Sequence, residues 1–283
     1  MAELTLPVHS APRRLPGAGP VFAAQVRYQL TLLTRNPRAL VSGLIMPALL
    51  LALELGRVQH LGTTAAGMAA LAPRVAGLLL FAAAAMALFT HASTLVVARE
   101  DGVLRRWRAA PLPPWAYFAA KITATVLAAD LAGVIVVLVS VEMAKLRLTL
   151  HAAAAMLLIG TLGALTFAAA GTAMTALIST AQAAQPMLML TYLPLVFLSG
   201  AFGPIHSLPH WLTTAVTYLP AQPAVDAMSR ALLQSGGTLV PVHDAAVLIG
   251  WLAAGLLASL RFFRWDPYRH DHKSRPGYAR PGR

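Results

Sequence analysis

Long apolar segments alternate with short polar, proline-containing segments along most of the chain. Crossing a bilayer as a helix takes about 20 apolar residues. Six segments approach or exceed that length: 40–55, 75–98, 116–141, 150–178, 187–201 and 245–263. The first is short and contains Pro47, and the fifth is interrupted by Pro194. The pattern predicts an all-α, polytopic integral membrane protein with six transmembrane helices in one domain, residues 21–263.

A further helix is expected before the first span. Apolar residues recur there at helical spacing, at Phe22, Val26, Leu30 and Leu33. Such a segment predicts an amphipathic N-terminal helix that lies in the plane of the membrane interface with its cations toward lipid headgroups. A plain lead-in helix to the first span is the alternative.

Residues 199–244 precede the last span and are dense in Pro and Gly. They are moderately apolar but too broken for a straight span. Non-helical backbone at membrane depth is tolerated only against protein or a watery cavity. We therefore expect short re-entrant helices at the outer face, with Trp211 and Tyr218 as interfacial anchors.

Composition supports a membrane protein. Hydrophobic residues make up 58% of the chain and charged residues 11%, about half the charged fraction of a soluble domain. The mean hydropathy is +0.66. The chain has no cysteine, which excludes disulfides, thiolate nucleophiles and cysteine-ligated metals. The net charge of +12 indicates basic segments near anionic lipid, and we expect no nucleic-acid partner.

The two ends of the chain are polar and predict cytoplasmic tails. Residues 1–20 hold Arg13 and Arg14 among Pro and Gly with no apolar run after them, so a disordered tail is expected in place of a signal peptide. Residues 264–283 are basic and proline-broken. Lys and Arg gather on one side of the spans if both termini lie inside, which is the positive-inside bias. We expect a multi-pass protein of the plasma or inner membrane.

The most charged internal segment is the loop 99–115, REDGVLRRWRAAPLPPW. A helix over about 102–107 places Val103, Leu104 and Trp107 on one side at i, i+3, i+4 spacing. Arginines occupy the other sides. A small apolar knob ringed by cations suits a cleft on an acidic soluble partner, where an aromatic anchor carries much of the affinity. Alternatively, these cations only fix the topology.

Residues 98–121 resemble the cytoplasmic signature of type-2 ABC exporter permeases. In that family an Arg-Glu pair leads into a Gly, a Leu, a Pro-Leu pair and a Lys that starts the third span. The corresponding residues here are Arg99, Glu100, Gly102, Leu104, Pro111, Leu112 and Lys121. The segment LSGAFGPIHSLPHWL and the later Tyr218, Leu219, Pro220 and Arg230 resemble the outer re-entrant segment of the family. Departures at Ala98, Val103, Arg105 and Pro113 leave the loop more basic than usual.

The resemblance implies a permease subunit that works beside a second permease protomer, identical or related, with each protomer docked to an ABC-type ATPase subunit. The residues expected to couple to the ATPase subunit are Arg99, Glu100, Gly102, Leu104, Arg105, Trp107 and Pro111. The chain has no phosphate-binding loop, because none of its lysines follows a glycine. We therefore expect no enzyme activity and no cofactor, since ATP would be bound by the partner. The expected cargo is hydrophobic or amphipathic: a drug, an antibiotic or a lipid-like molecule. The alternative is a non-transporting membrane scaffold or assembly factor.

Four polar side chains are candidates for a translocation pathway: His91, Asp130 and Tyr192 inside predicted spans, and Gln185 at the inner entry to the fifth span. Asp130 would contact substrate or a proton, or would be a hydrogen-bonded packing residue. A shared hydrogen bond in the core is favoured over a metal site for His91, so no metal is expected. Small residues at 160, 164, 168 and 171 predict close helix packing.

Overall fold

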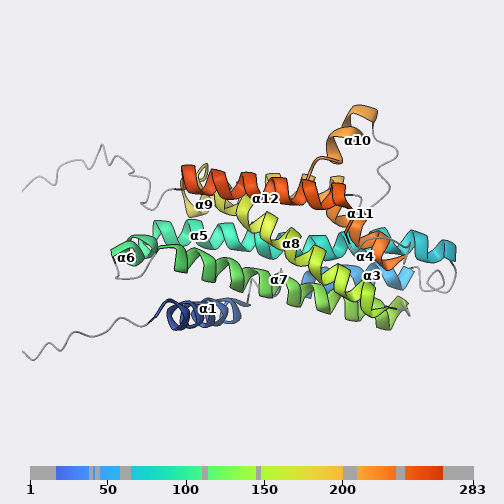
Figure 1. The fold of residues 1–283 in the computed structure, drawn as a ribbon, viewed down its shortest axis with the longest axis horizontal. Helices are drawn as coiled ribbons and strands as arrows, with labels where there is room; N and C mark the ends of the chain where they lie inside the picture. The colour runs from blue at the N-terminus through green and yellow to red at the C-terminus, as the bar shows by residue number, and fades with distance from the viewer. Residues whose placement is uncertain are drawn as a thin grey trace, which may run out of the picture.

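The part of the chain that the structure describes is helical throughout. The computed structural model describes residues 17–37, 41, 45–57, 65–109, 114–144, 148–199, 209–233 and 240–263. Its helices are α1 (Ala18–Thr34), α3 (Met46–Arg57), α4 (Ala65–Ala84), the π-helix η2 (Ala85–Thr90), α5 (His91–Glu100), α6 (Val103–Ala109), α7 (Pro114–Ala144), α8 (Leu150–Met174), α9 (Ala181–Leu198), α10 (His210–Val216), α11 (Ala221–Leu232) and α12 (Val242–Phe262). No strand occurs among these residues, which confirms the all-α class (Figure 1).

Five helical runs among the described residues are long and apolar enough to cross a membrane. They are Ala66–Glu100, which runs through α4, η2 and α5, then Trp115–Met143, Leu150–Met174, Ala181–Leu198 and Val242–Phe262. These runs match the second to sixth predicted spans. The first predicted span is represented by α3, whose 12 residues are shorter than a bilayer crossing requires. Parts of that predicted span, at 40 and 42–44, lie outside the described residues, so the six-span count stays a prediction.

Two spans begin earlier than predicted. The second was expected from residue 75, but its helix starts at Ala65 and includes Pro73. The apolar residues before Pro73 continue the helix, so the Pro-Arg pair does not mark its boundary. The fifth was expected from residue 187 but starts at Ala181, because the Thr180 hydroxyl accepts a hydrogen bond from Ala183 N at 3.2 Å. A threonine cap of this kind satisfies a free N–H at a helix start.

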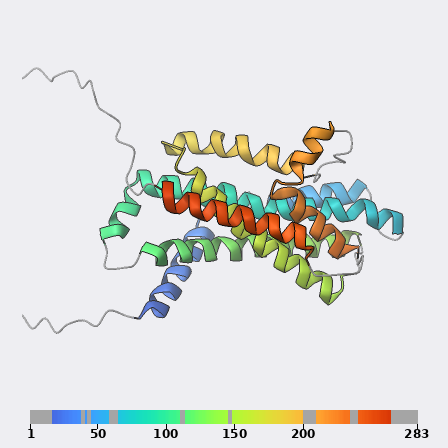
Figure 2. The same cartoon turned by 45° about the horizontal axis from the view of Figure 1, so that its top comes forward.

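The long helices lie side by side, with α1 and α6 at one end of the bundle and α3 and α11 at the other (Figures 1 and 2). We call these the α6 end and the α11 end. The run through α4, η2 and α5 is the core of the bundle and is almost entirely buried. It packs against α7, α8, α9 and α11, whereas α12 packs mainly on α8.

Two glycines permit the closest helix contacts. A Cβ at Gly171 of α8 would lie 2.9 Å from the carbonyl oxygen of Leu88 in η2. A Cβ at Gly255 of α12 would lie 2.9 Å from the carbonyl carbon of Ala169 in α8. Because both neighbours are backbone atoms, neither contact is relieved by a side-chain rotation. The packing predicted for the small residues of α8 is confirmed at Gly171.

Gly171→Ala is therefore expected to lower the stability of the bundle. Overpacking of this kind costs about 1–3 kcal/mol, and the melting temperature of the purified protein in detergent measures it. Gly163→Ala on the same helix is the matched control, since a Cβ there meets nothing within 4 Å. Equal melting temperatures for the two variants would contradict the close contact of α8 with η2.

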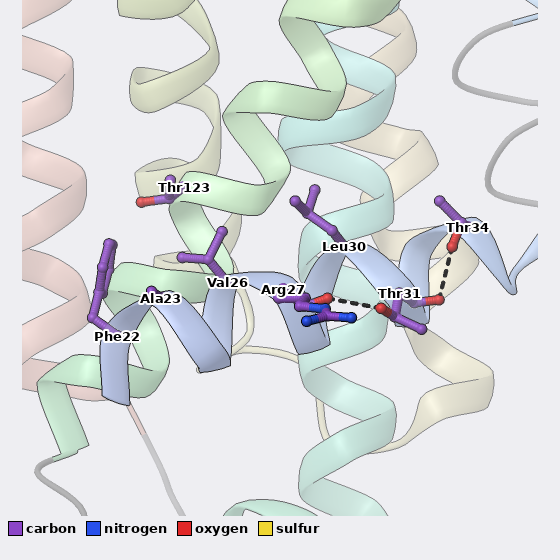
Figure 3. A pocket seen from close by; sticks show the side chains of 8 residues that line it. All are labelled: Phe22, Ala23, Val26, Arg27, Leu30, Thr31, Thr34 and Thr123. Carbon is purple, nitrogen blue, oxygen red and sulfur yellow. Dashed lines mark hydrogen bonds between the residues drawn. The ribbon is translucent and has the colours of Figure 1, made fainter. Parts of the chain in front are cut away.

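The N-terminal helix α1 lies crosswise to the bundle and packs on α7 (Figure 3). The contact with α7 involves side chains that the apolar spacing did not single out. Its most buried side chains are Gln25 and Gln29, with 8% and 7% of their surface exposed. The apolar Phe22, Val26 and Leu30 instead line an open groove of about 510 Å³ between α1 and Thr123 of α7. Packing against α7 buries these two glutamines, a tertiary contact that the periodicity does not encode.

The predicted re-entrant segment contains two short helices in its described part. Helix α10 carries Trp211, which is 70% exposed as expected for an interfacial anchor. Tyr218 is also exposed, and its carbonyl oxygen accepts a hydrogen bond from Trp251 Nε1 of α12 at 2.7 Å. Helix α11 is buried among α4, α8 and α12 and completes the α11 end of the core. Residues 1–16 and 264–283, which hold most of the predicted tails, lie outside the described residues.

Candidate functional site

The described part of the charged segment 99–115 contains a sharp turn and the short helix α6. Gly102 has a φ of +69°, a conformation that costs other residues about 1–2 kcal/mol. Its N–H donates to the Arg99 carbonyl at 3.1 Å, and its own carbonyl accepts from Arg106 N at 3.2 Å. Gly102 therefore ends α5 and begins α6, which is the physical reason for a glycine at this position. Pro111 lies outside the described residues.

The apolar side of α6 faces the bundle, so the predicted outward orientation is wrong. Leu104 is fully buried and packs with Leu95 of α5 and Tyr117 of α7. Trp107 is partly buried against the same cluster. The exposed face of α6 carries Arg105 and Arg106. The sequence shows that α6 has an apolar stripe but not that α5 and α7 cover it.

A row of aromatic rings joins α6 to three other helices. Its members are Tyr28 of α1, Trp107 of α6, Tyr117 and Phe118 of α7, and Phe263 just after α12. Neighbouring ring centroids are 6.5, 5.7, 5.5 and 4.8 Å apart along the row. These separations lie in or close to the range of favourable aromatic pairs. We call this set the aromatic row.

Arg99 and Glu100 hold the turn between α8 and α9. The Arg99 side chain is 1% exposed and donates to the carbonyl of Thr175 at 2.8 Å and to that of Ile178. These carbonyls lie after the last residue of α8, in the turn that leads to α9, where backbone acceptors have few helical partners. The Thr175 carbonyl also accepts from Ile178 N at 3.4 Å. The Glu100 carboxylate accepts from Ala181 N at the start of α9, a favourable place for a negative charge. We call this arrangement the Arg99–Glu100 clamp.

The clamp changes the interpretation of both residues. They were predicted to couple to a partner subunit, and nothing in their sequence surroundings points to residues 175–181. Both side chains form hydrogen bonds within their own chain, but Arg99 is buried and Glu100 is exposed. The α5–α6 turn is thereby joined directly to the C-terminal end of α8 and the N-terminal end of α9.

A layer of polar side chains crosses the core next to the π-helix η2. His91 Nδ1 lies 3.1 Å from Thr125 Oγ1 of α7, and His91 Nε2 lies 2.9 Å from Thr172 Oγ1 of α8. Lys121 of α7 is buried and donates to Thr94 Oγ1 at 3.0 Å. His91 is thus a hydrogen-bonded core residue, as predicted. π-helical turns of this kind are frequent at functional sites.

Two of the other pathway candidates make hydrogen bonds with other partners. Tyr192 of α9 is buried and donates to the Phe81 carbonyl of α4 at 3.3 Å. Gln185 is exposed on α9. Asp130 is half-buried on α7 and accepts from the Thr161 hydroxyl of α8. None of these hydrogen bonds joins one of the three residues to His91.

A further polar cluster at the α11 end was not predicted from the sequence. Arg230 of α11 forms an ion pair with Asp244 of α12, beside His243. Asp226 accepts from Gln222 Nε2 at 3.1 Å, and burial raises the pKa of Asp226, partly offset by that hydrogen bond and by Arg230. The described residues contain no group of three His, Cys, Asp or Glu side chains that could hold a metal ion.

The comparison with protein families decides the class of the protein. The model of the family described as ABC-2 type transporter matches residues 21–233, from α1 to the end of α11. The chain belongs to the ABC-2 type transporter family. This confirms the resemblance to type-2 ABC permeases. A search of curated proteins found no match.

Family membership defines the general role of the chain. An ABC-2 membrane domain is the permease component of an ABC transporter, a multi-pass membrane protein that works with an ATPase partner and is not itself the ATPase. The matched range includes the α5–α6 turn, the Arg99–Glu100 clamp and the helices α10 and α11.

Proposed function

We propose that the chain is the permease subunit of an ATP-driven exporter of hydrophobic or amphipathic molecules. The α6 end would face the cytoplasm, where a separate ABC-type ATPase subunit docks on α6. A second permease protomer, identical or related, would complete the pathway between the two bundles. The observation that carries this proposal is the two-sided character of α6. Its outer face bears exposed cations, and its inner face contacts several spans.

Two sets of contacts would carry movement from α6 into the membrane. The aromatic row joins α6 to α1, to the first turns of α7 and to the end of α12. The Arg99–Glu100 clamp joins the α5–α6 turn to the end of α8 and the start of α9. A displacement of α6 therefore reaches the α6 ends of all the long helices. Packed helices respond to such a push as rigid bodies that shift between discrete arrangements.

Closure of two ATPase subunits around ATP would draw the two α6 helices together. The membrane dimer would then change from a cavity open to the cytoplasm to one open to the outside. ATP can shift this equilibrium only through contacts that differ between the two states. The outer face of α6 supplies such contacts, since Arg105 and Arg106 suit an acidic cleft on the ATPase subunit.

Replacing Arg105 and Arg106 together by Glu is expected to prevent docking. Like charges across an interface are repelled at a cost of several kcal/mol, so the ATPase subunit should no longer co-purify with the tagged chain from its native membrane. Arg261→Glu is the matched control, because Arg261 is also exposed near the α6 end but belongs to α12. The measurement is the amount of ABC-type ATPase retained and the rate of ATP hydrolysis by the purified complex.

The same preparation tests the proposed function. The wild-type complex in proteoliposomes is expected to hydrolyse ATP and to move a lipophilic dye across the bilayer only when ATP is present. A membrane scaffold would retain partner proteins without ATP-dependent dye movement, and this result would overturn the proposal.

A further inference from the structure

A second cavity is separate from the groove beneath α1. It has a volume of about 320 Å³ and lies between α4, α7 and α8, with Met228 of α11 at one boundary. Its lining is apolar except at Asp130. Val134, Leu138 and Leu157 belong to this lining and are about half exposed, so the cavity opens at the surface of the bundle. We call it the Asp130 pocket.

Asp130 has little compensation for its charge inside this pocket. The Thr161 hydroxyl lies 3.2 and 3.1 Å from its two oxygens, but one hydroxyl has a single proton to donate. Among the described residues, no Lys, Arg or His side chain forms an ion pair with Asp130. Asp244 of the same protein shows the contrast, because Arg230 pairs with it. An apolar pocket with one uncompensated carboxylate is complementary to a ligand that supplies a positive charge.

We propose that the Asp130 pocket binds a hydrophobic organic cation, with its ammonium group against Asp130 and its apolar body against α7 and α8. This inference rests on the proposed function and specifies the cargo class. The pocket volume is at the small end of the range for small-molecule sites, about 300–1,000 Å³, so a compact amphiphile fits. Asp130 lies halfway along α7, at a depth that lipid headgroups do not reach. A ligand entering from the bilayer reaches the pocket through its exposed mouth.

Equilibrium binding to the full chain alone, in phosphatidylcholine nanodiscs, tests the proposal. The probe is radiolabelled phenylbutyltrimethylammonium, whose charge is permanent, and the comparison compound is its neutral isostere with carbon in place of nitrogen. Empty nanodiscs correct for partitioning into lipid. Wild-type protein should bind the cation saturably and at least about tenfold more tightly than the neutral isostere, as expected for a desolvated charge pair.

Two variants separate the contribution of the Asp130 charge to binding from that of the pocket volume. Asp130→Asn removes the carboxylate with little change of shape and should remove the preference for the cation. Gly160→Ala should weaken binding of the cation by taking up space, since its Cβ would lie 3.9 Å from Asp130 Oδ1 and 3.8 Å from Met228 Cε. Both are ordinary contacts, so the fold should be retained. Gly163→Ala, which lies outside the pocket, should bind like the wild type.

Three results would overturn the inference: no saturable binding of the cation, equal binding of the neutral isostere, or unchanged binding by Asp130→Asn. Equal binding of the two compounds would indicate a pocket for lipid chains. Disulfide formation between two copies of Leu138→Cys in membranes would also overturn it, because a second protomer would then cover the mouth. The chain has no other cysteine. None of these results depends on ATP or the ATPase subunit, so they leave the proposed function standing, and a failure of ATP-dependent transport leaves the binding result standing.

Discussion

Trp107→Ala is expected to uncouple ATP hydrolysis from transport. The Trp107 ring is the member of the aromatic row that connects α6 to both α1 and α7. Without it, α6 would still dock on the ATPase subunit through its exposed arginines, but its movement would be transmitted less completely. Loss of a coupling free energy of about 1–3 kcal/mol corresponds to roughly 5- to 150-fold. Dye transport per ATP hydrolysed should fall by a factor in this range.

Two control variants make this prediction specific. Trp107→Phe keeps a ring in the aromatic row and should retain most of the coupling. Trp115→Ala removes a tryptophan from the same end of α7 that is 55% exposed and lies outside the row, and it should transport normally. Unchanged transport per ATP in Trp107→Ala would show that the aromatic row does not carry the movement.

Arg99→Met is expected to release the turn between α8 and α9. The substitution keeps an apolar side chain of similar length but leaves the carbonyls of Thr175 and Ile178 without the guanidinium donor. The Thr175 carbonyl keeps a bond from Ile178 N at 3.4 Å, so the buried Ile178 carbonyl is the acceptor left unsatisfied, at a cost of about 1–3 kcal/mol. We expect a lower melting temperature and faster amide hydrogen exchange over residues 175–181. Transport should fall as well, since of the clamp only the Glu100 bond to Ala181 N would then join the α5–α6 turn to α9.

Arg99→Lys tests the geometry of the clamp separately from its charge. A lysine carries the same charge but lacks the planar fork that lets one arginine reach two acceptors, so it should rescue only part of the stability. Arg105→Met is the control, because Arg105 is exposed on α6. Wild-type hydrogen exchange over residues 175–181 in Arg99→Met would contradict the clamp.

Much of the fold could be predicted from the sequence because lipid requires long apolar helices. Each of the five spans in the described residues overlaps a predicted apolar segment. The predicted helix boundaries were wrong where a local feature competed with hydropathy. Helix α9, which Thr180 caps, begins six residues before the predicted apolar run. Pro73 lies inside a helix that was expected to start after it.

The candidate site was predictable in position but not in orientation. The resemblance located the coupling segment, and the spacing of Leu104 and Trp107 predicted one apolar face. Periodicity does not reveal which surface covers such a face, and here α5 and α7 cover it. The clamp was also invisible, because Arg99 meets carbonyl groups 76 and 79 residues away in the chain. Backbone acceptors carry no signal in the sequence.

Photo-crosslinking from α6 tests the central claim most directly. A photoreactive amino acid at position 105 would be activated in native membrane vesicles, and the products would be identified by mass spectrometry. The account predicts a crosslink to an ABC-type ATPase subunit whose yield changes when ATP is added. A crosslink to a protein on the outer side of the membrane, or no crosslinked partner at all, would contradict it.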